Sequence, residues 1–553
     1  MKYYRIAIVA PMEYRNDDLV WTCFETLRLA GHAVEVIDPR RFANCLNEDG
    51  SPDMSTLSTF VDRFKPDYIG CGNETAEQIL ERLEATGKGS DAPIRRFVVF
   101  GYVGPNNFGD ELIFSLICRQ IEKRFADAHI QLIGHDPNAT LKRHGIVSTT
   151  CDRKIDADVM LRGASALVYM AGIMFDDAFE AWSAGPVDPF LNPRSELGGQ
   201  TTYTLMATLY DVPAVFLGIG AGPLANADAQ RLVRLEARCG ARYLPRDAET
   251  ERLLLAAGVP AAQIDRKADL AFTLEDRSIG TAAKEALRER GLEPGGYIAI
   301  SLREHRTAHE NFVDTMAQAI AQICRSHELK ALFIDLSPED VALHRAIIDR
   351  IGDSTICAAI DCFADGDLTV DLISAAHAVI AMRLHCSIVA NVRGVQSIGL
   401  DYNEKIAAYY ELMDRSSFLM PMDAAAGQIA EAYDRMDAER EGDLELIAQG
   451  ATRCHALAMS AFDELERIVD ERPMPVLEKR MLYPRDVSFE EQWWHAAERE
   501  RDEARAERDA LRAEADALRA EIDRLRESTA WRVGRAITAA PRALKRALDS
   551  KRG

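Results

Sequence analysis

The stretch GYIAISLREHRTAHENFVDTMAQAIAQICRSHELKALFIDLS (residues 296–337) decides the fold class of this 553-residue chain. Its two ends, 296–304 and 329–337, are short apolar runs that predict buried strands, and the segment 309–326 between them has the pattern of a helix. A strand, a helix and a second strand in this order form the repeating unit of a parallel sheet covered by helices. The sequence therefore predicts an α/β fold.

Strand and helix patterns also alternate on both sides of this stretch. Downstream the alternation continues to a strand at 398–402, and upstream, in a unit that begins at Arg95, apolar runs predict strands at 166–172, 213–220, 241–245 and 268–274. Residues 1–95 carry a strand–helix–strand pattern of their own. We therefore expect two α/β lobes that face each other across a cleft, and a third α/β lobe before them. Their predicted boundaries are 95–285, 286–475 and 1–90.

The C-terminal part of the chain has a different character. Leucines recur every seven residues at Leu511, Leu518 and Leu525, which predicts a coiled coil over 488–528 that could join two copies of the chain. The alternative is a single solvated helix. The tail 529–553 contains seven lysines and arginines and a single acidic residue together with apolar side chains. It predicts either contact with an anionic membrane surface or a solubilising tail.

Bulk composition excludes several classes of function. The chain is 47% hydrophobic and 28% charged, as in globular proteins, and its formal net charge of −22 argues against nucleic acid as a partner. The eleven cysteines are scattered and form no CxxC pair, which predicts reduced thiols and no zinc site. The sequence shows neither a signal peptide nor an apolar run of about 18 residues. We expect a cytoplasmic protein, which the basic tail could hold at the inner face of the membrane.

Two glycine-rich motifs follow predicted strands. In GYVGPNNFGDELI (101–113), Asn107 and Gly109 belong to a turn, and Asp110 and Glu111 are expected at the N-cap and in the first turn of a helix. The N-terminus of such a helix can hold an anion or sugar hydroxyls. The second motif is FLGIGAGPL (216–224), in which Gly220 and Gly222 would let a ligand approach the backbone. In both cases the alternative is an ordinary turn after a strand.

Arginines and a histidine stand at the ends of three other predicted strands. Arg246 follows the strand 241–245 and Arg303 ends the strand of AISLR, where a planar guanidinium suits a carboxylate or a phosphate. Arg383 and His385 are two residues apart after the apolar run 378–382, so they share one face if the strand continues. Together they predict an anion site with an acid or base. The alternatives are surface ion pairs for the arginines and a core position for the histidine.

These motifs, together with DLAF (269–272) and IGLDYNEK (398–405), resemble in their order and spacing the polysaccharide pyruvyl transferase family over residues 96–415. The resemblance implies two Rossmann-like lobes in a GT-B-like arrangement, to which the N-terminal lobe is an addition. It also implies transfer of pyruvate, as a ketal, from phosphoenolpyruvate to a sugar of a cell-envelope polymer or an exopolysaccharide. The acceptor would be a sugar or a lipid-linked oligosaccharide, and neither a cofactor nor a metal is expected.

The resemblance also suggests roles for individual residues. Arg383 and His385 match the Arg-Leu-His motif at the phosphoenolpyruvate site of the family. Arg246 matches the arginine of an Arg-Asp motif in its first lobe, and Lys405 matches a lysine beyond its last tyrosine-containing strand. His385 would protonate the methylene carbon of the donor, and Asp110 would serve as the base toward the sugar hydroxyl. The remaining predicted contacts are Arg303, Asn107, Gly109, Glu111, Gly220 and Gly222.

One segment departs from the family pattern. The stretch VYMAGIMFDD (168–177) keeps only Gly172 where the family has a glycine-rich turn, and Met170 and Ala171 are bulkier. The departure leaves the identity of the acceptor open and is compatible with a changed activity. Two alternatives therefore stand beside the pyruvyl transferase: a GT-B glycosyltransferase that uses a nucleotide sugar, and a non-catalytic scaffold of envelope polysaccharide synthesis.

Overall fold

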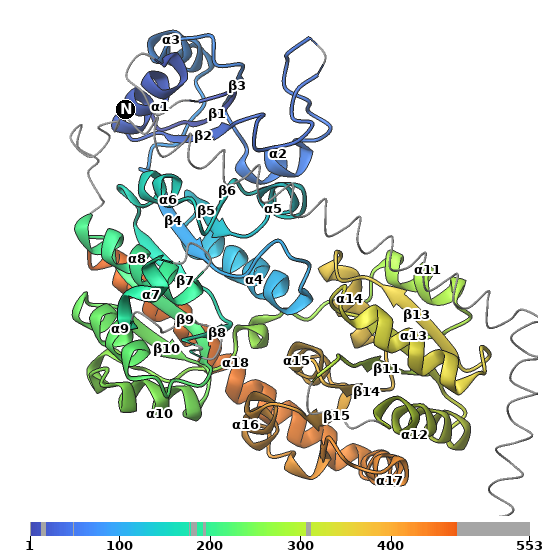
Figure 1. The fold of residues 1–553 in the computed structure, drawn as a ribbon. Coiled ribbons are helices and arrows are strands. Elements are labelled where there is room, and N and C mark those ends of the chain that lie inside the picture. The colour runs from blue at the N-terminus through green and yellow to red at the C-terminus, as the bar shows by residue number, and fades with distance from the viewer. Residues whose placement is uncertain are drawn as a thin grey trace, which may run out of the picture. The chain divides into compact units, whose positions relative to one another are not determined.

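The computed structural model describes residues 2–12, 18–47, 49–175, 177, 185–191, 195–305 and 311–472. The chain divides into two units at Tyr483, and all of the described residues belong to the first unit. The coiled coil predicted at 488–528 and the basic tail predicted at 529–553 lie outside the described residues, so both stay predictions. The first unit contains three separate parallel sheets, which confirms the predicted α/β class with several Rossmann-like sheets (Figure 1).

The N-terminal lobe is built on a three-stranded parallel sheet in the order β2-β1-β3, whose strands are Arg5–Val9 (β1), Ala33–Ile37 (β2) and Tyr68–Gly70 (β3). Its helices are Leu19–Leu29 (α1), Ser58–Phe64 (α2) and Ala76–Thr86 (α3). The sequence analysis did not predict α3, although Thr75 and Gln78 form a capping box at its start. The buried Arg28 donates to the carbonyl oxygens of Val159 (2.8 Å) and Arg162 (2.9 Å), and so ties this lobe to the next one.

The first of the two larger lobes has a parallel sheet in the order β10-β9-β7-β4-β5-β6, with β8 paired to β9. Its strands are Arg95–Phe100 (β4), Ala128–Gly134 (β5), Ser148–Thr150 (β6), Ala166–Tyr169 (β7), Ile173–Met174 (β8), Ala214–Ala221 (β9) and Arg242–Pro245 (β10). Its helices are Phe108–Arg124 (α4), Pro137–His144 (α5), Lys154–Leu161 (α6), Asp188–Leu191 (α7), Glu196–Leu209 (α8), Ala227–Arg238 (α9) and Ala248–Ala257 (α10).

One strand predicted for this lobe is wrong. The apolar run at 268–274 forms a 3-10 helix, Leu270–Thr273 (η3), in place of a strand. The Asp269 carboxylate caps this helix by accepting from the amide of Ala271 (3.0 Å). The run is buried, as expected, but a short apolar segment does not by itself distinguish a strand from a buried turn of helix.

The second larger lobe has a six-stranded parallel sheet in the order β13-β12-β11-β14-β15-β16. Its strands are Tyr297–Ser301 (β11), Lys330–Asp335 (β12), Cys357–Asp361 (β13), Ala378–Ala381 (β14), Gln396–Asp401 (β15) and Leu419–Pro421 (β16). Its helices are Thr281–Glu289 (α11), Phe312–Ser326 (α12), Asp340–Ile351 (α13), Gly366–Ser374 (α14), Leu384–Val392 (α15), Glu404–Leu412 (α16) and Ala426–Ala438 (α17).

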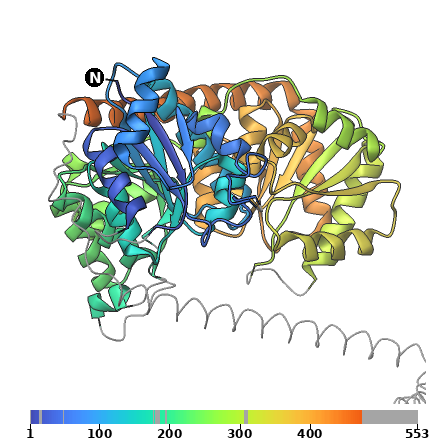
Figure 2. The same ribbon diagram turned by 90° about the horizontal axis from the view of Figure 1, so that it is seen from above.

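The long helix Arg440–Asp470 (α18) joins the two larger lobes. It packs against β15 and α15 of the second lobe and against β9, α4 and η3 of the first, and Figure 2 shows it running along both. Ion pairs join its C-terminal half to the first lobe, with Glu464 2.9 Å from Arg242 and Asp470 2.9 Å from Arg95. Neither α18 nor any other described helix combines the length and apolar composition of a membrane span.

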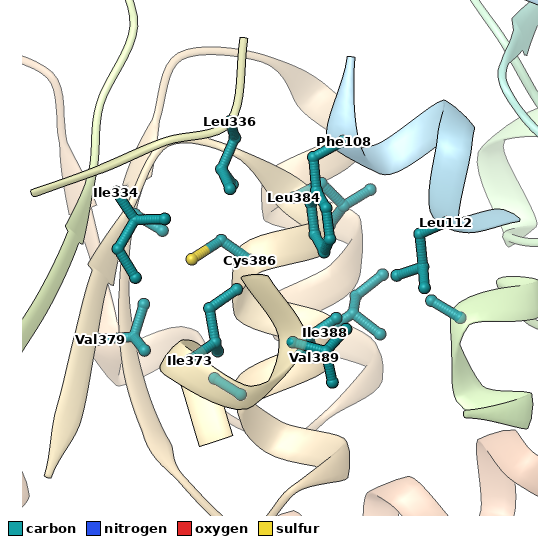
Figure 3. Close-up of a cluster of buried hydrophobic side chains, with 14 of the residues drawn as sticks. Phe108, Leu112, Ile334, Leu336, Ile373, Val379, Leu384, Cys386, Ile388 and Val389 are labelled. Carbon is teal, nitrogen blue, oxygen red and sulfur yellow. The ribbon is translucent and has the colours of Figure 1, made fainter. Parts of the chain in front are cut away.

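The first turn of α4 also crosses from one lobe to the other. The amide of Phe108 donates to the carbonyl oxygen of Leu336, which follows β12, at 2.9 Å. The side chains of Phe108 and Leu112 lie in a buried cluster with Leu384 and Ile388 of α15 (Figure 3). Apolar packing therefore holds the start of α4 against the start of α15, in the GT-B-like arrangement of two Rossmann-like lobes.

Candidate active site

A cavity of about 240 Å³ lies where the strands of both larger lobes end. Ligands of open α/β sheets bind at this edge. No described residue of the N-terminal lobe lines the cavity. Most of the residues that the sequence predicted for the site do line it: Asn107, Gly109, Asp110, Arg246, Arg303, Arg383, His385 and Lys405.

The start of α4 separates two acids that the sequence analysis grouped together. Asn107 is the N-cap, since its side chain accepts from the amide of Gly109 (3.2 Å), so the prediction of an acid at this position is wrong. Asp110 and Glu111 both lie in the first turn, and only Asp110 lines the cavity. The Glu111 carboxylate is buried on the other side of the turn, where it accepts from the amide of Gly104 (2.9 Å) and pairs with Arg143 (2.8 Å). Successive helical residues point about 100° apart, which explains the separation.

Arg383 and His385 do not share a strand face as predicted, because β14 ends at Ala381 and α15 begins at Leu384. Arg383 occupies the N-cap position of α15, and His385 lies in its first turn. The guanidinium of Arg383 donates two hydrogen bonds to the carboxylate of Asp340, from Nη2 at 2.5 Å and from Nε at 3.1 Å. Asp340 is fully buried at the start of α13, so it fixes Arg383 in one orientation.

A buried carboxylate links the cationic residues of the two lobes. Oδ2 of Asp269 lies 3.0 Å from Nη1 of Arg246 and 3.6 Å from Nε2 of His385. Burial alone would raise the pKa of Asp269, but the charges of His385 and Arg246 and the amide of Ala271 hold it well below its usual value. Asp269 is therefore ionised; it accepts a hydrogen bond from Arg246 and lies close to the imidazole of His385. It belongs to the DLAF motif, but the sequence analysis gave it no role in the site.

Two of the predicted glycines lie against side chains of the predicted site. A Cβ atom at Gly109 would lie 2.0 Å from Nδ1 of His385, and one at Gly220 would lie 2.8 Å from Nη2 of Arg246. Real Cβ atoms do not approach other atoms this closely, so both glycines make room for a functional side chain. Gly220 supports Arg246 without lining the cavity, and Gly222 does not line it either.

The cations of the second lobe gather around Tyr402. The guanidinium of Arg303 lies 5.7 Å and Nζ of Lys405 5.8 Å from the centroid of its ring. Burial lowers the pKa of Lys405, although Tyr402 opposes the shift. Burial would raise the pKa of Tyr402, but Lys405 and Arg303 outweigh it and lower that pKa. The sequence analysis did not single out Tyr402, because an aromatic residue after a strand is normally part of the core.

Asp110 is the acid among these cations. Burial raises the pKa of its carboxyl group to about 6, against the opposing charges of His385 and Lys405. The group therefore changes protonation state close to neutral pH. A carboxyl group of this kind can accept a proton from a hydroxyl group and release it again.

The departure from the family pattern lies in the wall of the same cavity. Met170, Ala171 and Gly172 follow β7 and line the cavity. Met170 is buried, and its side chain fills the space beside Gly101. A Cβ atom at Gly101 would lie 2.0 Å from Cγ of Met170. The bulky residue of this segment therefore packs against the start of the β4–α4 turn.

The sequence profile of the polysaccharide pyruvyl transferase family matches residues 107–404, which is more than half of the chain. No curated protein sequence matches. Similar solved structures include a UDP-GlcNAc 2-epimerase from Neisseria meningitidis bound to UDP-GlcNAc (11% identity, 68% of this chain and 100% of that chain covered, TM-score 0.47). A glycosyltransferase from Rickettsia africae is also similar (9% identity, 69% and 100% covered, TM-score 0.45). On the strength of the profile match, this chain belongs to the polysaccharide pyruvyl transferase family.

Proposed function

We propose that the chain transfers the pyruvyl group of phosphoenolpyruvate to two hydroxyl groups of a sugar, on a precursor of a cell-envelope polymer or exopolysaccharide. The observation that carries this proposal is the set of cations around one cavity: Arg246, Arg303, Arg383, Lys405 and the imidazole of His385. Phosphoenolpyruvate carries both a carboxylate and a phosphate, which planar guanidinium groups and an ammonium group suit. In a chain with a net charge of −22, such a local cluster of cations supports the proposal that an anion binds here.

In the first step, His385 protonates the donor. The imidazolium gives its proton to the methylene carbon, which becomes a methyl group, while positive charge develops at the neighbouring carbon and a sugar hydroxyl attacks it. The Asp269 carboxylate lies 3.6 Å from Nε2 of the imidazole that gives the proton in this step. The arginines neutralise the carboxylate and the phosphate through the reaction.

The second step closes the ketal. The carbon–oxygen bond to phosphate breaks, and a second hydroxyl of the sugar attacks the same carbon. The two hydroxyl groups lose one proton each. One proton passes to Asp110 and makes up for the proton that His385 gave to carbon, and the other leaves on inorganic phosphate. The balance requires no oxidant or reductant.

The direct test measures the release of inorganic phosphate from phosphoenolpyruvate. We expect the full-length protein, incubated with phosphoenolpyruvate and a panel of lipid-linked and simple glycosides, to release inorganic phosphate in ³¹P spectra only when an acceptor is present. A pyruvylated sugar should accumulate in equal amount. A parallel incubation with UDP-GlcNAc tests the glycosyltransferase alternative: release of UDP with no turnover of phosphoenolpyruvate would contradict the proposal.

The role of Asp110 predicts a pH dependence. As a base it must be ionised, so kcat/KM should fall as the pH drops through about 6, the pKa of its carboxyl group. Asp110→Asn should lower kcat/KM by ~10²-fold at pH 8 and abolish this acidic limb. The profile is measured from pH 5 to pH 9 with saturating donor. An unchanged acidic limb in the variant would assign the base to another group.

A further inference from the structure

The cavity has two chemically different walls. The cations come from the second lobe and from Arg246 at the end of β10. The wall formed by the ends of β4, β5 and β7 contains no arginine or lysine among its described residues. It consists of Phe100, Gly101, Tyr102, His135, Met170, Ala171 and Gly172. An anion is therefore attracted to one wall only, and the other wall suits a neutral ligand.

The sheet order keeps the two walls apart. In the order β10-β9-β7-β4-β5, the strand before His135 is four positions from the strand before Arg246, or about 19 Å at the usual spacing of parallel strands. One small anion cannot contact both ends. The turn from β4 to α4 lies between them, and from this turn Asn107 and Asp110 line the cavity. The proposed base is thus placed between the two walls.

Tyr102 is the prominent side chain of the neutral wall. It is 43% exposed, although it follows a buried strand, and its ring centroid lies 4.6 Å from that of His135. The backbone fixes this arrangement, because the amide of His135 donates to the carbonyl oxygen of Val103 at 2.9 Å. Burial lowers the pKa of His135, so its ring is neutral near pH 7 and can both donate and accept a hydrogen bond. An exposed aromatic ring beside a polar partner suits a ligand with an apolar face and polar edges.

We infer that Tyr102 and His135 form the platform for the acceptor: the ring of Tyr102 packs against the C–H face of a pyranose, and His135 and Asn107 bind hydroxyl groups at its edge. This inference rests on the proposed function for the identity of the ligand as an acceptor. A pyranose on the platform presents two hydroxyls toward Asp110 and His385, while the donor occupies the cationic wall.

Saturation-transfer NMR tests the platform without turnover. The probes are the methyl β-glycosides of glucose, galactose and mannose at millimolar concentration, with the full-length chain. At least one should receive saturation at its ring protons, and added phosphoenolpyruvate should not displace it. Tyr102→Ala should weaken this binding about 10-fold, whereas Tyr102→Phe retains it because the ring remains. Tyr102→Leu, which keeps an apolar side chain but no ring, should behave like the alanine variant. The binding retained by Tyr102→Phe guards against misfolding as the cause of the loss.

A matched control and separate outcomes complete the test. Leu412→Ala removes another exposed apolar side chain (38% exposed), outside the cavity, and should leave sugar binding unchanged. The inference is overturned if none of the three glycosides binds, if Tyr102→Ala and Tyr102→Leu bind like the wild type, or if phosphoenolpyruvate displaces the sugar. Sugar binding that depends on Tyr102, in a protein that does not turn over phosphoenolpyruvate, would reject the proposed donor and retain the platform.

Discussion

We expect replacement of His385 by glutamine to lower pyruvyl transfer by ~10²–10⁴-fold, because the amide cannot give a proton to the methylene carbon of the proposed donor. The variant keeps a planar polar side chain of similar reach in the first turn of α15, so the packing of Leu384 and Cys386 in the core is preserved. The measurement is the rate of phosphate release at saturating phosphoenolpyruvate. A thermal unfolding curve of each variant shows whether the fold is retained.

A second histidine provides the control. His327 lies at the end of α12, where it pairs with Asp434 at 2.8 Å, and it does not line the cavity. His327→Gln should leave the rate within about a factor of two, as surface substitutions away from a site usually do. If His385→Gln also keeps the wild-type rate, the proton must come from another group, and the proposed first step is wrong.

We expect Gly109→Ala to reduce transfer by ~10²-fold, although it adds only a single methyl group. Gly109 lies in the first turn of α4, and the new Cβ would stand 2.0 Å from Nδ1 of His385. The imidazole must move away from its place beside Asp269, and a displacement of about 1 Å is enough for a loss of this size. The helix itself favours alanine over glycine by roughly 0.5–1 kcal/mol, so the loss of activity should not come from unfolding.

The matched control is Gly427→Ala, which makes the same change in the first turn of α17, where a Cβ atom meets nothing within 4 Å. It should leave the rate unchanged. Because Gly109→Ala acts through His385, adding it to His385→Gln should cause little further loss. Independent losses that multiply in the double variant would show that Gly109 serves the reaction in some other way.

Most of the strands and cations of the site could be predicted from the sequence because the signals for them are local. Periodicity of apolar residues is a local property, and so is the position of a charged residue just after a buried run. Arg246 and Arg303 were found in this way and Lys405 through the resemblance to the family, and the structure places all three around one cavity. The same reasoning failed at 268–274, where a run of apolar residues is buried as a turn of 3-10 helix.

By itself, then, the sequence determined the α/β class, the family and most of the charged residues of the cavity. Only the tertiary structure decided which partners those residues have. Asp340 fixes Arg383, Asp269 joins Arg246 to His385, and Glu111 turns away from the cavity. These pairings connect residues that are distant along the chain or on opposite sides of a helix. They depend on how α4 packs against α15, and apolar patterns encode no such contact between separate elements.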